Sequence, residues 1–232
     1  MRGDANIMIA SSRAPKYPSA LRDLGHGLFF SSALKLVALS AVLLALALAP
    51  DAARADSVEE AAQVCSGCHG ENGVPMDKTI PVIWGQRREY LLKELHDFKT
   101  GHRKNETMAA IVDSLSKTDM EELASYFSKK QWPTQEQAAP PADVVSKALA
   151  VINQLNCRDC HQDHFQGDYV RPSLRGQSED YLLKTMTDFH TGERANFPAM
   201  SALMKSLNED QLKPLAAYLA SLPPKVPSIS ER

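Results

Sequence analysis

Three patterns that mark other classes of protein are missing from this 232-residue sequence. No segment sustains the alternation of apolar and polar residues that is typical of a half-buried β-strand, which argues against a sheet-based fold. No basic patch with interleaved aromatic residues is present, and residues 56–232 hold 20 Lys and Arg against 25 Asp and Glu. That balance argues against a nucleic-acid partner. The longest apolar run, Leu36 to Ala49, has only fourteen residues, too few for a comfortable membrane span.

Cysteine is scarce too, and all four cysteines lie in two copies of the pattern Cys-x-x-Cys-His. The copies occupy residues 65–69 and 157–161. Two thiols one helical turn apart can each add to a vinyl group on the same porphyrin edge, and the next histidine can bind the iron. The pattern therefore predicts two covalently attached haem c groups. The attachment residues would be Cys65, Cys68, Cys157 and Cys160, and the proximal ligands His69 and His161.

Other uses of paired cysteines compete with this interpretation. A zinc ribbon usually needs a second pair about 15–20 residues away, and neither motif has one. A thioredoxin-like site needs a preceding strand, whereas Val64 and Asn156 end helical patterns. Two disulfides in an exported protein would leave both histidines unexplained. Haem attachment explains every residue of both motifs, and zinc or disulfides remain the alternatives.

The start of the chain has the layout of a secretory signal. Lys35 precedes the apolar run, and Ala53-Arg54-Ala55 provides a small-x-small cleavage site before Asp56. Covalent haem attachment in bacteria takes place outside the cytoplasm, which agrees with export. We therefore expect residues 1–55 to be a signal peptide with an extended N-terminus and the protein to be periplasmic. An uncut segment would instead anchor it to the membrane.

The remainder of the sequence is an internal repeat with an offset of 91 to 92 residues. Gly85-Gln86 recurs as Gly176-Gln177, and Tyr-Leu-Leu-Lys, Asp-Phe, Thr-Gly-x-Arg and Leu-Ala-x-Tyr follow in the same order in both copies. Between the copies, the stretch from Trp132-Pro133 to Pro140-Pro141 indicates a linker, because paired prolines cannot continue a helix. We expect domains at 56–133 and 143–225, a linker at 134–142 and a tail at 226–232.

Each copy shows three helical patterns and none of a strand. One helix runs into the Cys-x-x-Cys-His motif, and a second covers about 86–99 or 177–190. A third begins at a capping box, Thr118-x-x-Glu121 or Asn208-x-x-Gln211, and ends before Pro133 or Pro223. The fold class is therefore all-α, in two small tandem domains. A buried haem would supply much of the core that such short chains lack.

The sixth ligand of each iron should occupy a matched position in the two copies. Met108 follows Arg103 after a polar loop, and Met200 follows Arg194 in the same way, the only methionines that coincide. Each precedes an apolar segment, Ala109-Ala110-Ile111 or Ser201-Ala202-Leu203. His96, His102, His164 and His190 have no matched histidine, and we expect them at the solvated surface. The expected axial pairs are His69 with Met108 and His161 with Met200. A thioether ligand closes the iron to substrates and raises its potential relative to a second imidazole.

Pro81 and Pro172 each open a matched Pro-x-x-x-Gly-Gln stretch. The plain interpretation is a loop that ends at a helix. Alternatively, a carbonyl in this stretch lies near the second nitrogen of the proximal histidine, where it would fix the ring and tune the iron.

Together, these motifs resemble the dihaem cytochrome c4 family. The resemblance covers nearly all of residues 56–232 and implies two tandem class I cytochrome c domains in a periplasmic protein. It also implies electron transfer between a membrane quinol-oxidising complex and a terminal oxidase or reductase, without a small-molecule substrate. The family's axial ligands correspond to His69, Met108, His161 and Met200.

Two other kinds of function compete with that of a free carrier. A dihaem enzyme, such as a peroxidase or a thiosulfate-oxidising cytochrome, needs an open iron or an unusual ligand such as cysteine. Every cysteine here is used in attachment, and each copy offers a methionine. The same dihaem module could also be a permanent subunit of a larger dehydrogenase or oxidase complex, which the sequence does not distinguish from a carrier.

Overall fold

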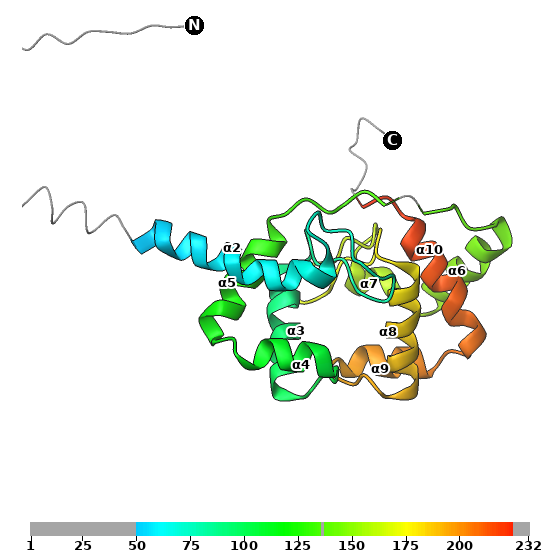
Figure 1. Cartoon of the computed structure of the whole chain (residues 1–232). Helices are drawn as coiled ribbons and strands as arrows, with labels where there is room; N and C mark the ends of the chain where they lie inside the picture. The colour runs from blue at the N-terminus through cyan, green and yellow to red at the C-terminus, as the bar shows by residue number, and fades with distance from the viewer. Residues whose placement is uncertain (1–49, 136, 225–232) are drawn as a thin grey trace, which may run out of the picture. The chain divides into compact units, whose positions relative to one another are not determined.

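The computed structural model describes residues 50–135 and 137–224, except for the side chains of residues 50–57. From Asp51 onward the described residues belong to one compact unit. We call residues 50–133 the N-terminal half and residues 142–224 the C-terminal half. The helices of the first half are α2 (Pro50–His69), α3 (Arg88–Thr100), α4 (Glu106–Asp113) and α5 (Lys117–Ser128). Those of the second are α6 (Ala142–Gln154), α7 (Cys157–His161), α8 (Glu179–Thr191), α9 (Pro198–Lys205), the 3₁₀ helix η1 (Glu209–Gln211) and α10 (Leu212–Ser221) (Figure 1).

The fold is helical, as the sequence predicts. Over the described residues the only β-type pairing is an isolated bridge between Asp168 and Arg171. No helix in this part of the chain is both long and apolar enough to cross a membrane. Most of the predicted signal peptide, residue 136 of the predicted linker and the whole predicted tail lie outside the described residues.

The repeated Leu-Ala-x-Tyr motif forms the centre of each hydrophobic core. Leu123 and Ala124 on α5 are buried against Leu91 of α3, and Leu215 and Ala216 on α10 are buried against α8. An alanine at this position allows the helices to approach closely, while the preceding leucine fills the space between them. The same four-residue pattern therefore packs the same pair of helices in both halves.

The Thr-Gly-x-Arg motif ends the central helix of each half. Gly101 caps α3 with φ 75°, and Gly192 caps α8 with φ 91°, a left-handed conformation that glycine adopts without a Cβ clash. The chain then turns back, so that the Arg103 N–H donates to the Asp97 carbonyl at 3.0 Å and the Arg194 N–H to the Asp188 carbonyl at 2.9 Å. In Figure 1 α3 and α8 stand side by side, and this turn brings both arginines between the two halves.

The helices that enter the two cysteine motifs differ. In the N-terminal half α2 continues without a break to His69, so the expectation that Val64 ends a helical pattern is wrong. In the C-terminal half α6 stops at Gln154, and Asn156 has a left-handed conformation with φ 50° before α7 begins. Asparagine tolerates this conformation better than most residues, which explains why the interruption falls there.

Two further details differ from the sequence-based expectations. The capping box of α5 consists of Ser116 and Asp119 rather than Thr118 and Glu121, so the helix begins earlier than predicted. The predicted box of Asn208 and Gln211 is confirmed at η1. The short helices α4 and α9 were expected only as apolar segments after the two methionines. They do not follow Met108 and Met200 but contain them.

Candidate functional site

A cavity of about 1030 Å³ extends along both cysteine motifs. Its walls come from both halves and are mainly apolar, with Leu91, Phe98 and Phe127 on one side and Phe165, Leu182 and Phe189 on the other. All eight residues that the sequence analysis singled out lie along it: Cys65, Cys68, His69, Met108, Cys157, Cys160, His161 and Met200. The volume is at the upper end of the range for small-molecule sites.

His69 is buried at the end of α2, and its side chain has a fixed hydrogen-bond partner. Its Nδ1 donates to the Pro81 carbonyl at 2.8 Å. Because that carbonyl can only accept, Nδ1 carries the proton and the lone pair of the neutral ring is on Nε2. Burial lowers the pKa of His69, and the Pro81 carbonyl partly opposes the shift, so the ring is neutral near pH 7. A neutral imidazole with a free Nε2 is the form that binds a metal.

His161 has the same arrangement at the end of α7. Its Nδ1 donates to the Pro172 carbonyl at 3.1 Å, and burial lowers its pKa in the same way. The prediction that a carbonyl of the Pro-x-x-x-Gly-Gln stretch supports the histidine is therefore confirmed in both halves. Histidines that bind metals almost always have such a partner on the second ring nitrogen.

The four cysteines are free thiols, which argues against the disulfide alternative. Burial raises the pKa of Cys65 and of Cys157. Both thiols are therefore protonated near neutral pH when nothing is bound to them. Among residues 50–135 and 137–224, no group of three or more His, Cys, Asp or Glu side chains is placed to hold a metal ion. The zinc alternative thus finds no support in the part of the chain that the structure describes.

Met108 and Met200 occupy the same position on matched helices. Each is the third residue after the N-cap, which is Asn105 for α4 and Phe197 for α9. The Asn105 side chain accepts from the Met108 N–H at 2.9 Å, whereas α9 begins with Pro198. Both methionines are half-buried and line the cavity. The two halves therefore place a thioether at equivalent points by different capping chemistry.

The unmatched histidines are less uniform than expected. His96 and His102 are exposed, as predicted. His164 and His190 are half-buried, so the prediction of a solvated position is wrong for them. His190 is half-buried because its Nδ1 donates to the Met204 carbonyl at 2.9 Å, a hydrogen bond that joins α8 to α9. Neither residue lines the cavity.

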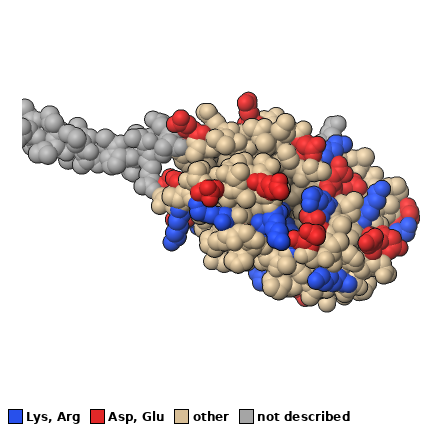
Figure 2. Space-filling model, turned by 60° about the horizontal axis from the view of Figure 1, so that its bottom comes forward, with Lys and Arg blue, Asp and Glu red and all other residues tan. Residues whose placement is uncertain are grey.

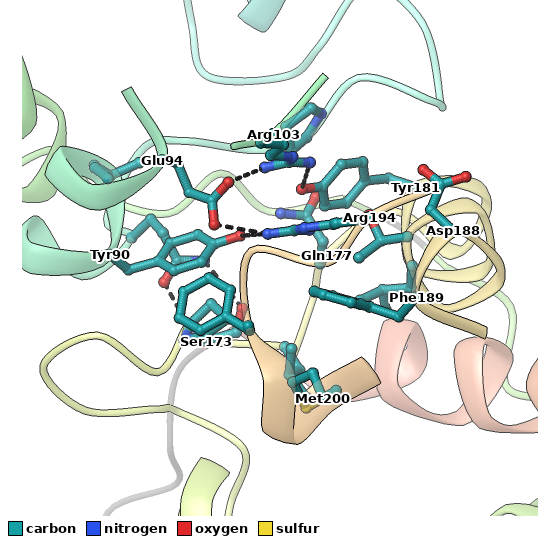
Figure 3. A pocket seen from close by; sticks show the side chains of 18 of the residues that line it. Tyr90, Glu94, Arg103, Ser173, Gln177, Tyr181, Asp188, Phe189, Arg194 and Met200 are labelled. Carbon is teal, nitrogen blue, oxygen red and sulfur yellow. Dashed lines mark hydrogen bonds and ion pairs between the residues drawn. The ribbon is translucent and has the colours of Figure 1, made fainter. Parts of the chain in front are cut away.

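A buried polar network joins the halves beside the cavity, and the sequence analysis did not identify it (Figure 3). The Glu94 carboxylate binds both Arg103 and Arg194, the latter at 2.7 Å. Arg103 also donates to the Tyr181 hydroxyl at 3.1 Å, and Arg194 to the Tyr90 hydroxyl at 3.4 Å. Each arginine belongs to one half and each tyrosine partner to the other. The contact between the halves is therefore reciprocal.

Each guanidinium of this network also lies over an aromatic ring of its own half. Arg103 is 4.7 Å from the centre of the Phe98 ring, and Arg194 is 4.5 Å from that of Phe189. Stacking on a ring leaves the edge of a guanidinium free for hydrogen bonds. The repeated Asp-Phe and Thr-Gly-x-Arg motifs contain the phenylalanine and the arginine of each stacked pair. Neither motif shows that the arginine donates hydrogen bonds to residues of the other half.

The ionisation of the two tyrosines is unequal. Burial raises the pKa of Tyr90, and the nearby Glu94 carboxylate adds to the effect. Burial acts on Tyr181 in the same direction, but Arg103 and Arg194 outweigh it and lower the pKa of Tyr181 to about 8. The two arginines thus create a positive region between the halves, and the Glu94 carboxylate is its main counter-charge.

The residues present fit a covalently bound haem in each half. Each copy of the repeat contributes the same set of groups to the one cavity. The set is two thiols one turn apart, a neutral histidine with Nε2 free, an apolar wall and a thioether.

Comparisons with known proteins agree with this geometry. The family model for cytochrome c matches residues 145–223. Cytochrome c4 of Azotobacter vinelandii is 30% identical over 180 residues, which cover 69% of this chain and 85% of that protein. A protein of Stutzerimonas stutzeri named thiosulfate dehydrogenase electron acceptor is 29% identical over 175 residues, with coverages of 70% and 80%.

Similarity extends to solved structures. The crystal structure of reduced recombinant cytochrome c4 from Pseudomonas stutzeri superimposes with a TM-score of 0.65 at 27% identity, covering 72% of this chain and 97% of that one. The expected all-α fold of class I cytochrome c type is therefore confirmed. The chain belongs to the cytochrome c4 family: it is a dihaem electron-transfer protein, not an enzyme, and its two haem c groups are covalently attached.

Proposed function

We propose that the haem groups are attached through Cys65, Cys68, Cys157 and Cys160 and that their axial ligands are His69 with Met108 and His161 with Met200. The observation that carries this proposal is the repeated arrangement at one cavity of a neutral histidine and a methionine at the third position of a matched helix. When bound, the haem irons supply one-electron couples between ferric and ferrous states.

The residues around each proposed haem site suit the ferric–ferrous couple of a bound haem to electron transfer. The Pro81 and Pro172 carbonyls hold the two imidazole rings in one tautomer and one orientation. Met108 and Met200 provide neutral thioethers that favour the ferrous state and leave no open position for a substrate. The apolar walls exclude water, which limits the reorganisation that accompanies each change of charge.

The protein is proposed to act in the periplasm as a carrier between a membrane quinol-oxidising complex and a terminal oxidase or reductase. Export is supported by the apolar run before Ala53-Arg54-Ala55. An uncut run would give the same carrier a membrane anchor. Positive and negative side chains are mixed on the face drawn in Figure 2, which suits a transient redox partner better than a polyanion.

A second candidate donor is a sulfur-compound dehydrogenase. It is favoured by the similarity to the thiosulfate dehydrogenase electron acceptor of Stutzerimonas stutzeri over most of both chains. Purification of the native protein under mild conditions separates a free carrier from a permanent subunit. Stopped-flow mixing with each reduced donor then identifies the one that reduces both haems rapidly.

The ligand assignment is tested by optical spectroscopy and carbon monoxide binding. We expect two haems per chain by pyridine haemochrome, the weak red ferric band of methionine ligation, and poor carbon monoxide binding by the ferrous protein. Met108→Ala and Met200→Ala should each create carbon monoxide binding at one haem and lower its potential.

Met204→Ala is the matched control, because Met204 is a buried methionine of the C-terminal core that also lines the cavity. It should lower stability by about 2–5 kcal/mol without creating carbon monoxide binding. Tight binding by the unmutated protein would contradict the assignment and favour a dihaem enzyme.

A further inference from the structure

Gln86 and Gln177 are matched residues of the repeat with no place in the axial ligation proposed above, yet each is only 3% exposed. Each uses its side-chain amide to hold one residue of the opposite half. Gln177 Oε1 accepts from the Val82 N–H at 2.8 Å, and its Nε2 donates to the Val82 carbonyl at 3.0 Å. Gln86 makes the same two bonds with Ser173, at 2.8 and 3.0 Å.

The residues that these glutamines hold come directly after the prolines that support the histidines. The Val82 N–H belongs to the same peptide group as the Pro81 carbonyl, which accepts from His69 Nδ1. A continuous chain of hydrogen bonds therefore runs from His69 through one peptide group to Gln177. An equivalent chain runs from His161 through the Pro172–Ser173 peptide group to Gln86.

The glutamine side chains are fixed in the orientation that this chain requires. Gln177 Oε1 also accepts from the N–H of Ser178 at 3.0 Å, and Gln86 Oε1 from the N–H of Arg87 at 2.9 Å. Because both neighbouring groups are N–H donors, the amide oxygen and not the nitrogen must face them. Each glutamine is thus held within its own half while it binds the other.

Hydrogen bonds that share a peptide group polarise one another, and burial makes this coupling stronger. An N–H that donates to Gln177 makes the Pro81 carbonyl a better acceptor for the His69 Nδ1 proton. A stronger bond at Nδ1 makes the ring a better electron donor through Nε2, which stabilises the ferric state of a bound iron. Loss of the glutamine should therefore raise the potential of that haem.

We propose that Gln86 and Gln177 are positioning residues, each of which sets the orientation and donor strength of the proximal histidine in the opposite half. The effect is crossed: Gln177 of the C-terminal half acts on His69, and Gln86 of the N-terminal half acts on His161. This inference rests on the proposed ligation of iron by both histidines.

The test uses the full-length dihaem protein with Gln177→Met, which keeps a long unbranched side chain but removes the amide oxygen and the amide nitrogen that bind Val82. We expect the ferric–ferrous equilibrium constant of the N-terminal haem to shift toward ferrous by up to about tenfold, ~59 mV for a one-electron couple. The potential of the C-terminal haem should stay unchanged. Gln86→Met should shift only the C-terminal haem.

The second readout is the Nδ1 proton resonance of each histidine in the ferrous protein labelled with ¹⁵N-histidine, assigned through contacts to Pro81 and Pro172. It should move toward a weaker hydrogen bond for His69 in Gln177→Met and for His161 in Gln86→Met. Ser178→Ala is the matched control, because the Ser178 hydroxyl donates to the Lys78 carbonyl of the other half without reaching a histidine.

Three results would overturn the proposal: no shift in either glutamine variant, equal shifts of both haems, or the same shift in Ser178→Ala. The last two would show that any loosening of the contact between the halves changes the potentials. If the unmutated protein has no Nδ1 proton resonance for His69 and His161, the ligation itself is wrong. Failure of the glutamine proposal and failure of the proposed ligation therefore give different results.

Discussion

At the scale of single residues, Glu94 breaks the symmetry of the buried polar network between the halves. Arg103 and Arg194 are matched, as are Tyr90 and Tyr181, but the position equivalent to Glu94 is Thr185. The Glu94 carboxylate therefore serves both arginines alone. Its side chain is 7% exposed, so solvent compensates little for its loss.

We predict that Glu94→Gln lowers the free energy of unfolding by about 3 kcal/mol, because it leaves two buried cations without their shared counter-charge. Thermal and denaturant unfolding of the dihaem protein measure the change. Glu89→Gln is the control, since Glu89 pairs with Arg88 at the surface and its loss should cost under about 1 kcal/mol. Similar effects of the two substitutions would contradict the prediction.

At the scale of helices, the ends of α3 and α8 depend on backbone conformation more than on side-chain contacts. A Cβ at Gly101 would have nothing within 4 Å, so its left-handed φ of 75° is the only obstacle to another residue. The turn at this position leads directly to Arg103 and its contacts with the other half.

We expect Gly101→Ala to lower stability by about 1 kcal/mol from backbone strain alone. Gly101→Asn should cost less, because asparagine tolerates the left-handed region. Denaturant unfolding of both variants separates strain from packing. If Ala and Asn destabilise equally, the left-handed conformation of Gly101 is not the cause.

Sequence patterns predicted those helices whose apolar residues recur over several turns, such as α3 and α8. They do not indicate α4 and α9, because eight residues are too few for a helical period to show. The support of His69 by Pro81 was predictable because both are repeated at a constant spacing. The partners of Gln86 and Gln177 were not predictable, because each amide binds backbone atoms of the other half. Any residue type provides such atoms, so the sequence contains no signal for them.

At the scale of the whole molecule, the two halves have unequal protein cores. The buried cluster of the N-terminal half is Ala62, Leu91, Leu123, Ala124 and Phe127. That of the C-terminal half is larger and draws on α6, α8, α9 and α10. The N-terminal half should therefore depend more strongly on its haem for a stable core.

We predict that Cys65→Ala with Cys68→Ala removes one covalent haem and unfolds much of the N-terminal half. Cys157→Ala with Cys160→Ala should also remove one haem but leave more helix. Pyridine haemochrome counts the haems, and far-UV circular dichroism measures the helix that remains. Two covalent haems in either double variant would refute the assignment of the attachment sites. Equal loss of helix in the two double variants would refute the claim that the N-terminal half depends more strongly on its haem.

The contacts between the halves follow the rule of a two-fold symmetric homodimer. Gln86 binds Ser173 while Gln177 binds the matched Val82, and Arg103 binds Tyr181 while Arg194 binds the matched Tyr90. In an isologous interface of this kind, one self-complementary patch serves both partners. Here both copies of the patch lie on one chain and satisfy each other. While the two halves stay paired, a second molecule finds no such patch exposed, and an assembly of intact molecules must use a different surface.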